Sequence, residues 1–381
     1  MASILQNTLN QYWERLTTGW KLGGGVTTKR YLSLLGSVDT EITGGASQYT
    51  RTYLSENYTV AKQLRHYQNA YLDNGCIHGK AGLAVGTYGG NATLRNLILG
   101  HVPLFFAGKS ITAVAGALWS YYGGNKGGAI ANTADYCKGV YVDADSDSYN
   151  GIKIGSGAAL NTTTAGYNFM SLFAHDGSMP GMKAYVGQYT GDATNPHAIS
   201  VADFGEPDVV IIKGEGAQSA VFRTSNEVYT AGTECDYFVI ATASLASQGI
   251  ESLDANGFTV GTNATVNTNA VKYNYIMLKS DASGSANICL KQFIGQAGDG
   301  NHIDLPFKPS FMLFIPGAST TPMMWFNSQT AGSTSYVSAA TANVTDAVQS
   351  ADDYGFTLDG GIILNATNVP CNVIAIEADI T

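Results

Sequence analysis

Three aspartates at alternate positions are the first residues in the sequence whose spacing could do chemistry. Asp143, Asp145 and Asp147 present carboxylates in the pattern with which calcium-binding loops begin. The sixth position of such a loop would be Ser148 instead of glycine, and the twelfth would be Ile154 instead of glutamate. The pattern excludes an EF-hand and leaves two interpretations: an irregular calcium site or, favoured by shorter equivalents later in the chain, a polar turn.

A second candidate group is aromatic. Trp119, Tyr121 and Tyr122 run into a glycine-rich loop, a composition that suits a platform for stacking sugars. Phe222 and Trp325 stand at about the same position in two later segments, as a core residue would. We therefore favour core packing for Trp119 and expect Tyr121 and Tyr122 to be the exposed pair.

Catalytic patterns are missing from the sequence. It contains no G-x-S-x-G elbow, no H-E-x-x-H motif and no phosphate-binding loop, and its 6 histidines do not cluster. The 5 cysteines include no C-x-x-C pair, which favours thiols and assembly in a reducing cytoplasm. We predict a protein without enzymatic activity or cofactor. A glycosidase with two carboxylates far apart in the sequence is the enzymatic alternative.

The elements that must position these residues correspond to a sequence pattern that occurs three times along the chain. Residues 85–93 and 186–194 are nearly the same, and residues 294–299 form a shorter third version. Three further landmarks recur in the same order, namely a proline before an apolar run (Pro103, Pro207, Pro309), a glycine turn before a strand (Gly151, Gly257, Gly355), and an asparagine six residues before a Tyr-Asn or Cys-Asn pair (Asn161, Asn267, Asn365). One unit therefore occurs three times in the chain.

The copies predict tandem β domains. Equivalent landmarks lie roughly 100 residues apart, well above the period of solenoids and propellers. Short apolar or alternating stretches, such as residues 273–278, are bounded by Gly, Asn, Asp and Ser, which is typical of strands. We predict a mainly β protein with three antiparallel sandwich or jelly-roll-like domains, at residues 85–180, 181–285 and 286–381.

The first 84 residues differ from the copies. Their net charge is +3, against −12 for the remainder. Apolar residues spaced by three and four predict a short helix with one apolar face, made of Ile4, Leu5, Leu9, Tyr12, Trp13 and Leu16. That face could pack on the protein's own body or anchor it in an assembly. We interpret residues 1–84 as an attachment region.

The composition limits the partners. Only 13% of the residues are charged, against about 25% in ordinary soluble proteins, which suits a protein packed against other subunits. The acidic copies argue against nucleic acid, because phosphate binding needs clustered cations. No signal peptide and no apolar run of about 18 residues is present, so we expect no membrane insertion.

The repeated pattern is G-x-Y-x-G-[ND]-A-T, a proline with an apolar strand, G-F-T-[VL], and N-x5-Y-N-[YF]-[IM]. It resembles a β-rich module of tail-fibre and other virion proteins of tailed bacteriophages. The third copy departs from it, with Ala297 in place of the early tyrosine and Cys371 in place of the late one, and the first copy has Ile152 where phenylalanine is expected. The resemblance implies a structural or adhesive role without catalysis, and it assigns no ligand residues.

We expect a tail-fibre or receptor-binding protein, attached to the virion through residues 1–84. The alternative is a capsid or tail decoration protein, such as a cement protein or head fibre, and a third class is a cell-surface depolymerase. Expected partners are other virion proteins, further copies of the chain, with a trimer favoured by symmetry, and a polysaccharide or protein of the host surface. The expected location is the virion, assembled in the host cytoplasm.

Overall fold

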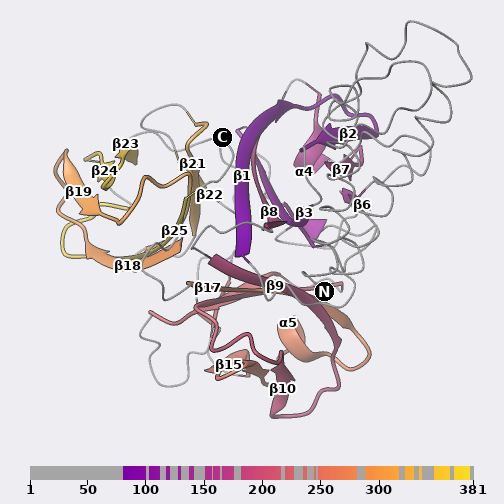
Figure 1. Cartoon of the computed structure of the whole chain (residues 1–381). Coiled ribbons are helices and arrows are strands. Elements are labelled where there is room, and N and C mark those ends of the chain that lie inside the picture. Colours follow the sequence, from indigo (N-terminus) through magenta and orange to yellow (C-terminus); the bar gives the residue numbers. More distant parts are fainter. Residues whose placement is uncertain are drawn as a thin grey trace, which may run out of the picture. The chain divides into compact units, whose positions relative to one another are not determined.

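The fold is mainly β, as predicted, and the strands of the described residues pair in antiparallel sheets (Figure 1). It is a computed structural model, and it describes residues 80–99, 103–111, 117–120, 128–129, 137–140, 151–156, 158–163, 165–175, 182–215, 219–226, 235–237, 244–245, 248–280, 288–316, 322–329, 334–336, 347–360 and 364–377. The predicted amino-terminal helix lies outside these residues.

The first copy contains a large and a small sheet. Its elements are β1 (Lys80–Gly89), β2 (Arg95–Ile98), β3 (Pro103–Ser110), β4 (Ala117–Ser120), β5 (Gly128–Ala129), β6 (Cys137–Val140), β7 (Gly151–Ile154), α4 (Ala158–Asn161) and β8 (Gly166–His175). The large sheet has the order β1-β8-β3-β4-β5, and the small sheet has the order β2-β7-β6.

The second copy repeats this plan. Its elements are β9 (Met182–Thr190), β10 (His197–Ser200), β11 (Val209–Gly214), β12 (Val221–Thr224), β13 (Cys235–Tyr237), β14 (Ser244–Leu245), β15 (Ile250–Asp254), β16 (Gly257–Val260), α5 (Ala264–Asn267) and β17 (Lys272–Ser280). The large sheet has the order β9-β17-β11-β12-β13-β14, and the small sheet has the order β10-β16-β15.

The third copy, orange to yellow in Figure 1, repeats it again. Its elements are β18 (Ile288–Ile294), β19 (Asn301–Asp304), β20 (Phe311–Pro316), β21 (Met323–Phe326), β22 (Ser335–Tyr336), β23 (Val348–Asp352), β24 (Gly355–Leu358) and β25 (Pro370–Ile376). The sheets have the orders β18-β25-β20-β21-β22 and β19-β24-β23. The strand order is therefore the same in all three copies, except that the large sheet of the second copy has one more edge strand, β14.

One feature of the sheets was not predicted. The large sheets of the first and second copies join into one 11-stranded sheet, because β1 pairs with β9 through Lys80 with Lys183 and Ala81 with Met182. The first strand also begins at Lys80, before the predicted domain boundary at residue 85. The other two predicted boundaries lie outside the described residues.

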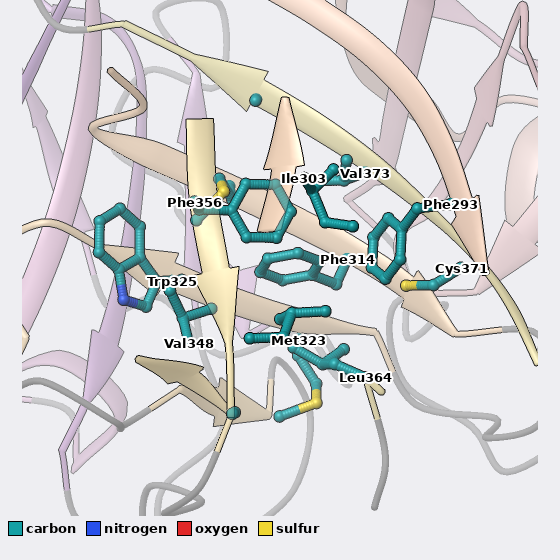
Figure 2. Close-up of a cluster of buried hydrophobic side chains, with 14 of the residues drawn as sticks. Phe293, Ile303, Phe314, Met323, Trp325, Val348, Phe356, Leu364, Cys371 and Val373 are labelled. Atoms are coloured by element: carbon teal, nitrogen blue, oxygen red, sulfur yellow. The ribbon is translucent and has the colours of Figure 1, made fainter. Parts of the chain in front are cut away.

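Each copy is a two-layer sandwich, as the third one shows (Figure 2). Phe293, Phe314 and Trp325 of its large sheet meet Ile303 and Phe356 of its small sheet. The rings of Phe314 and Phe356 cross edge to face with centroids 5.5 Å apart. Full burial of one such side chain contributes roughly 1.5–3 kcal/mol, so this layer of aromatic residues holds the two sheets together.

The cores of the other copies use equivalent strands. In the second copy, Val210 and Tyr273 of the large sheet pack with Ile199 and Phe258 of the small sheet. The core of the first copy combines Tyr88, Leu97, Phe106, Ile152, Ile154, Leu160, Ala165, Tyr167 and Phe169. Alternation along the strands explains the arrangement, since every second residue of a strand faces the same layer.

The hairpin glycines are required by geometry. Gly257 and Gly355 begin β16 and β24 with φ of 151° and 143°, a region that other residues rarely adopt. A Cβ added at either residue would lie 2.0 Å from a backbone oxygen, that of Ile199 or Ile303. The repeated glycine turn is therefore structural.

Candidate functional site

The most strongly repeated polar residue is a buried asparagine that fixes a loop. Asn161, Asn267 and Asn365 are at most 1% exposed. Their Oδ1 atoms accept hydrogen bonds from the backbone N–H groups of Asn91, Asp192 and Gln296, at 2.9, 2.9 and 2.8 Å. Their Nδ2 atoms donate to backbone carbonyls in the same loops, those of Thr93, Thr194 and Gly298. We call these three residues the asparagine pins.

The pinned loops have one backbone conformation. Ala92, Ala193 and Ala297 each follow the pinned residue and adopt a positive φ, of 57°, 58° and 56°. A non-glycine residue seldom holds this conformation unless the surrounding structure fixes it. The G-[ND]-A-T motif therefore encodes a constrained turn, and its repetition reflects the fold.

The structure corrects the sequence alignment of the third copy. Sequence comparison placed Ala297 at the position of Tyr88, but Ala297 is the counterpart of Ala92. The register gives Tyr88 opposite Tyr167, and Phe293 opposite Cys371. The early aromatic residue is therefore retained as Phe293. The placement of Cys371 at the late tyrosine position is confirmed, and it is buried in the core.

Paired tyrosines brace the short helices of the first two copies, which sequence reasoning missed. The rings of Tyr189 and Tyr273 stack with centroids 5.2 Å apart. The Tyr273 hydroxyl accepts from Thr268 N at 2.8 Å and donates to Ala264 O at 2.7 Å, at the two ends of α5. In the first copy the Tyr167 hydroxyl accepts from Thr162 N at 2.7 Å.

Most of the predicted site residues lie outside the described residues. This holds for the anchor residues Ile4, Leu5, Leu9, Tyr12, Trp13 and Leu16, the aspartates Asp143, Asp145 and Asp147, and the tyrosines Tyr121 and Tyr122.

Trp119 pairs with Phe106, and Trp325 pairs with Met312 at the equivalent position. Phe222, expected at about this position, lies one residue away from it, and Arg223 stands at the equivalent position, opposite Val210.

The most exposed large hydrophobic residue described is at the tip of the β23–β24 hairpin. Tyr354 is 75% exposed. Beside it, His302 Nε2 lies 3.1 Å from Asp352 Oδ2, and His302 Nδ1 lies 3.2 Å from Asp304 Oδ1. The hydrogen bond from Tyr354 N–H, together with His302, holds the pKa of Asp352 below its usual range. We call these four residues the tip patch.

In the corresponding hairpin of the second copy, the aspartate binds side chains of the hairpin itself. Asp254 accepts from Ser252 Oγ and Thr259 Oγ1, both at 2.7 Å, so its carboxylate is used within the hairpin. Asn256 takes the place of Tyr354, as the backbone bonds from Val201 and Leu305 to these two residues show. The polar turn predicted at Asp143, Asp145 and Asp147 lies outside the described residues, and its later equivalents at Asp254 and Asp352 form these two hairpins.

A second polar group crosses the middle of each large sheet. In the second copy Lys213 lies opposite Asn274, which lies opposite Gln188 on its other side. In the first copy the same positions hold Lys109, Asn168 and Thr87, and in the third they hold Ile315, Asn372 and Gln292. We call each set a polar rung. The sequence reasoning found the asparagines but not their partners.

Two of the rungs contain a lysine, which is fully buried in the first copy and partly buried in the second. Lys109 is 0% exposed, and burial lowers the pKa of its ammonium from 10.5 to about 8. Burial lowers the pKa of Lys213 to about 8 as well. Each lysine donates to the next backbone carbonyl of its own strand, at 3.0 Å to Ser110 O and 2.9 Å to Gly214 O.

Within the described ranges, no group of His, Cys, Asp and Glu side chains could hold a metal ion. Cys235, Cys289 and Cys371 are thiols. A search of the described residues finds no helix that is long and apolar enough to cross a membrane. Comparison with known protein families, with curated proteins and with solved structures gives no match.

Proposed function

We propose that the protein is a non-enzymatic structural component of a bacteriophage virion, of the tail-fibre or receptor-binding type. One observation carries the proposal. The three copies share the asparagine pins, and the second and third also share the hairpin glycine but differ at the exposed tip of that hairpin, where Asn256 and Tyr354 stand. A repeated scaffold with variable tips is what an assembly or adhesion protein needs, because each tip can contact a different partner.

The sequence resemblance to phage tail-fibre modules supports the same proposal. The residues that carry this resemblance are the glycines, tyrosines and asparagines that fix the loops and short helices. The amino-terminal 84 residues would attach the protein to other virion proteins. Several weak contacts with a host polysaccharide or protein would gain affinity by avidity if the protein is a trimer.

We place one host contact at the tip patch. Tyr354 offers an exposed aromatic ring, and Asp304 and His302 offer polar groups beside it. Tyrosine supplies rigid contact area at low entropic cost, and its neighbours supply hydrogen bonds. The substitution Tyr354→Asn gives the third copy the residue of the second, and it should weaken cell binding without unfolding the protein. Leu94→Asn, at a residue 53% exposed, is the matched control.

The main test removes the amino-terminal region. Because β1 begins at Lys80, the deletion must end at residue 79. The shortened protein should stay folded and bind host cells but no longer enter virions. A folded shortened protein that binds no cells, while the full chain does, would contradict the proposal. Copy number per virion separates the alternative, since hundreds of copies would indicate a capsid decoration protein.

A further inference from the structure

The polar rung of the second copy gathers an amine, a carboxamide and a carboxyl group. Lys213 on β11 lies directly opposite Asn274 on β17. Gln188 Nε2 on β9 donates to Asn274 Oδ1 at 2.9 Å and lies 3.3 Å from Glu215 Oε1. One amide nitrogen therefore contacts both the carboxamide of Asn274 and the carboxyl group of Glu215.

All of these residues face the side of the large sheet opposite the sandwich core. Val210, Ile212, Tyr273 and Tyr275 belong to the core cluster, and alternation turns their neighbours Lys213 and Asn274 to the other face. Directly opposed side chains start from Cβ atoms about 5 Å apart, within the reach of a lysine. Lys213 Nζ donates to Gly214 O in this structure, so its side chain must rotate away from that carbonyl to reach Asn274, while the backbone can stay as it is.

The surroundings raise the fraction of the lysine that is a neutral amine. Burial lowers the pKa of Lys213 to about 8. At pH 7 about a tenth of the side chains then carry a neutral amine, far more than for an ordinary lysine. A neutral lysine amine is a nucleophile, and a neighbouring carboxyl group can transfer protons.

We propose that Lys213 and Asn274 form an intramolecular amide bond. Lys213 Nζ bonds to Cγ of Asn274, and the bond between Cγ and Nδ2 of Asn274 breaks. The amine and the carboxamide become one secondary amide and one molecule of ammonia, with Glu215 carrying a proton from Nζ to the leaving nitrogen. No oxidant or reductant takes part.

The other two copies lack part of this group. Lys109 lies opposite Asn168 in the first copy, but Ile111 holds the position of Glu215, as their backbone bonds to Gly166 O and Lys272 O show. Asn168 Oδ1 accepts instead from Ser328 Oγ at 3.0 Å. The third copy has Ile315 in place of the lysine. One bond per chain is therefore expected, in the second copy.

The bond would tie two central strands of one sheet covalently. The link joins β11 to β17, which are also paired by backbone hydrogen bonds. A cross-link between residues far apart in the sequence restricts the unfolded chain and so stabilises the fold. The inference does not depend on the proposed function, because it concerns the chemistry of the chain alone.

Intact-mass measurement of the denatured full chain, after incubation at pH 8, tests the proposal. The mass should fall short of the sequence mass by one ammonia, and digestion should release a branched peptide that joins Lys213 to Asn274. A chain of full mass overturns the proposal. So does an ammonia loss that maps to Asn256 before Gly257, where an asparagine can cyclise on its own.

Three variants sharpen the result. Lys213→Met and Glu215→Ile should restore the full mass, and Glu215→Ile reproduces the residue of the first copy. Lys109→Met is the matched control and should keep the ammonia loss. A loss that disappears with Lys109→Met but persists with Lys213→Met would contradict the assignment.

Discussion

The second and third copies of the unit use the same hairpin in opposite ways. In the second copy the aspartate of the hairpin, Asp254, is held by Ser252 and Thr259, and the tip carries Asn256. In the third copy Asp352 contacts His302, and the tip carries the exposed Tyr354. The two hairpins have the same strand register, so the difference lies in the side chains that they carry.

The polar rungs show the same contrast. The second copy places Lys213 opposite Asn274, whereas the third places Ile315 opposite Asn372. In every copy the asparagine pin, the pinned loop and the order of the strands that the copies share are unchanged. The comparison indicates that a few residues that fix the backbone define the unit. The side chains at the remaining positions can differ from copy to copy.

The largest expected effect comes from the hairpin glycines. Gly257→Ala and Gly355→Ala should each cost on the order of 4 kcal/mol, because the added Cβ meets a backbone oxygen at a positive φ. Chemical denaturation of each variant measures this. Gly89→Ala is the control, since no atom lies within 4 Å of its added Cβ. A mild effect at only one of the two hairpins would break the equivalence of the copies.

The buried lysine of the first copy should give a smaller effect of opposite sign. Lys109→Met should stabilise the protein by about 2 kcal/mol at pH 7, because burial lowers the pKa of Lys109 to about 8. The folded state binds fewer protons than the unfolded state between pH 8 and 10.5. The parent protein therefore recovers stability as the pH rises through this window.

Denaturation curves of the parent and of Lys109→Met across pH 7 to 10.5 test this sign. The stability difference should shrink steadily above pH 8. A difference that grows with pH, or a destabilised variant at pH 7, would show that Lys109 stabilises the fold. Ile315 is the natural precedent for an apolar residue at this position.

The smallest expected effect concerns the tyrosine brace. Tyr273→Phe should cost about 1 kcal/mol, because Thr268 N and Ala264 O lose their shared partner. Thermal unfolding checks this change. Tyr354→Phe, at the exposed tip, should leave the melting temperature unchanged. An equal loss in both variants would indicate that the hydroxyl of Tyr273 has no special role.

Much of this architecture was predictable from sequence, because glycine, tyrosine and asparagine recur where the backbone needs them. The mainly β class and the strand at residues 273–278 follow from such local signals. The position of Phe293 did not, because the short glycine motif of the third copy fits two alignments and only strand pairing decides between them. The rungs were missed because Lys213 and Asn274 are far apart in sequence.

The joined sheet and the one-turn helices were missed for other reasons. The pairing of β1 with β9 depends on how two copies meet, and no local sequence pattern predicts that contact. The helices α4 and α5 span 4 residues each, too few for a helical period to show in the sequence. Asn263, which caps α5 by accepting from Thr265 N, was the available signal.

The central claim is that the three copies are one unit held by equivalent pins. Hydrogen exchange of the backbone amides of Asn91, Asp192 and Gln296 in the full chain tests it most directly. All three amides should be protected, and Asn161→Ala, Asn267→Ala and Asn365→Ala should each expose only the amide of its own copy. An amide that exchanges freely in the parent protein, or a pin whose removal leaves its amide protected, would contradict the account.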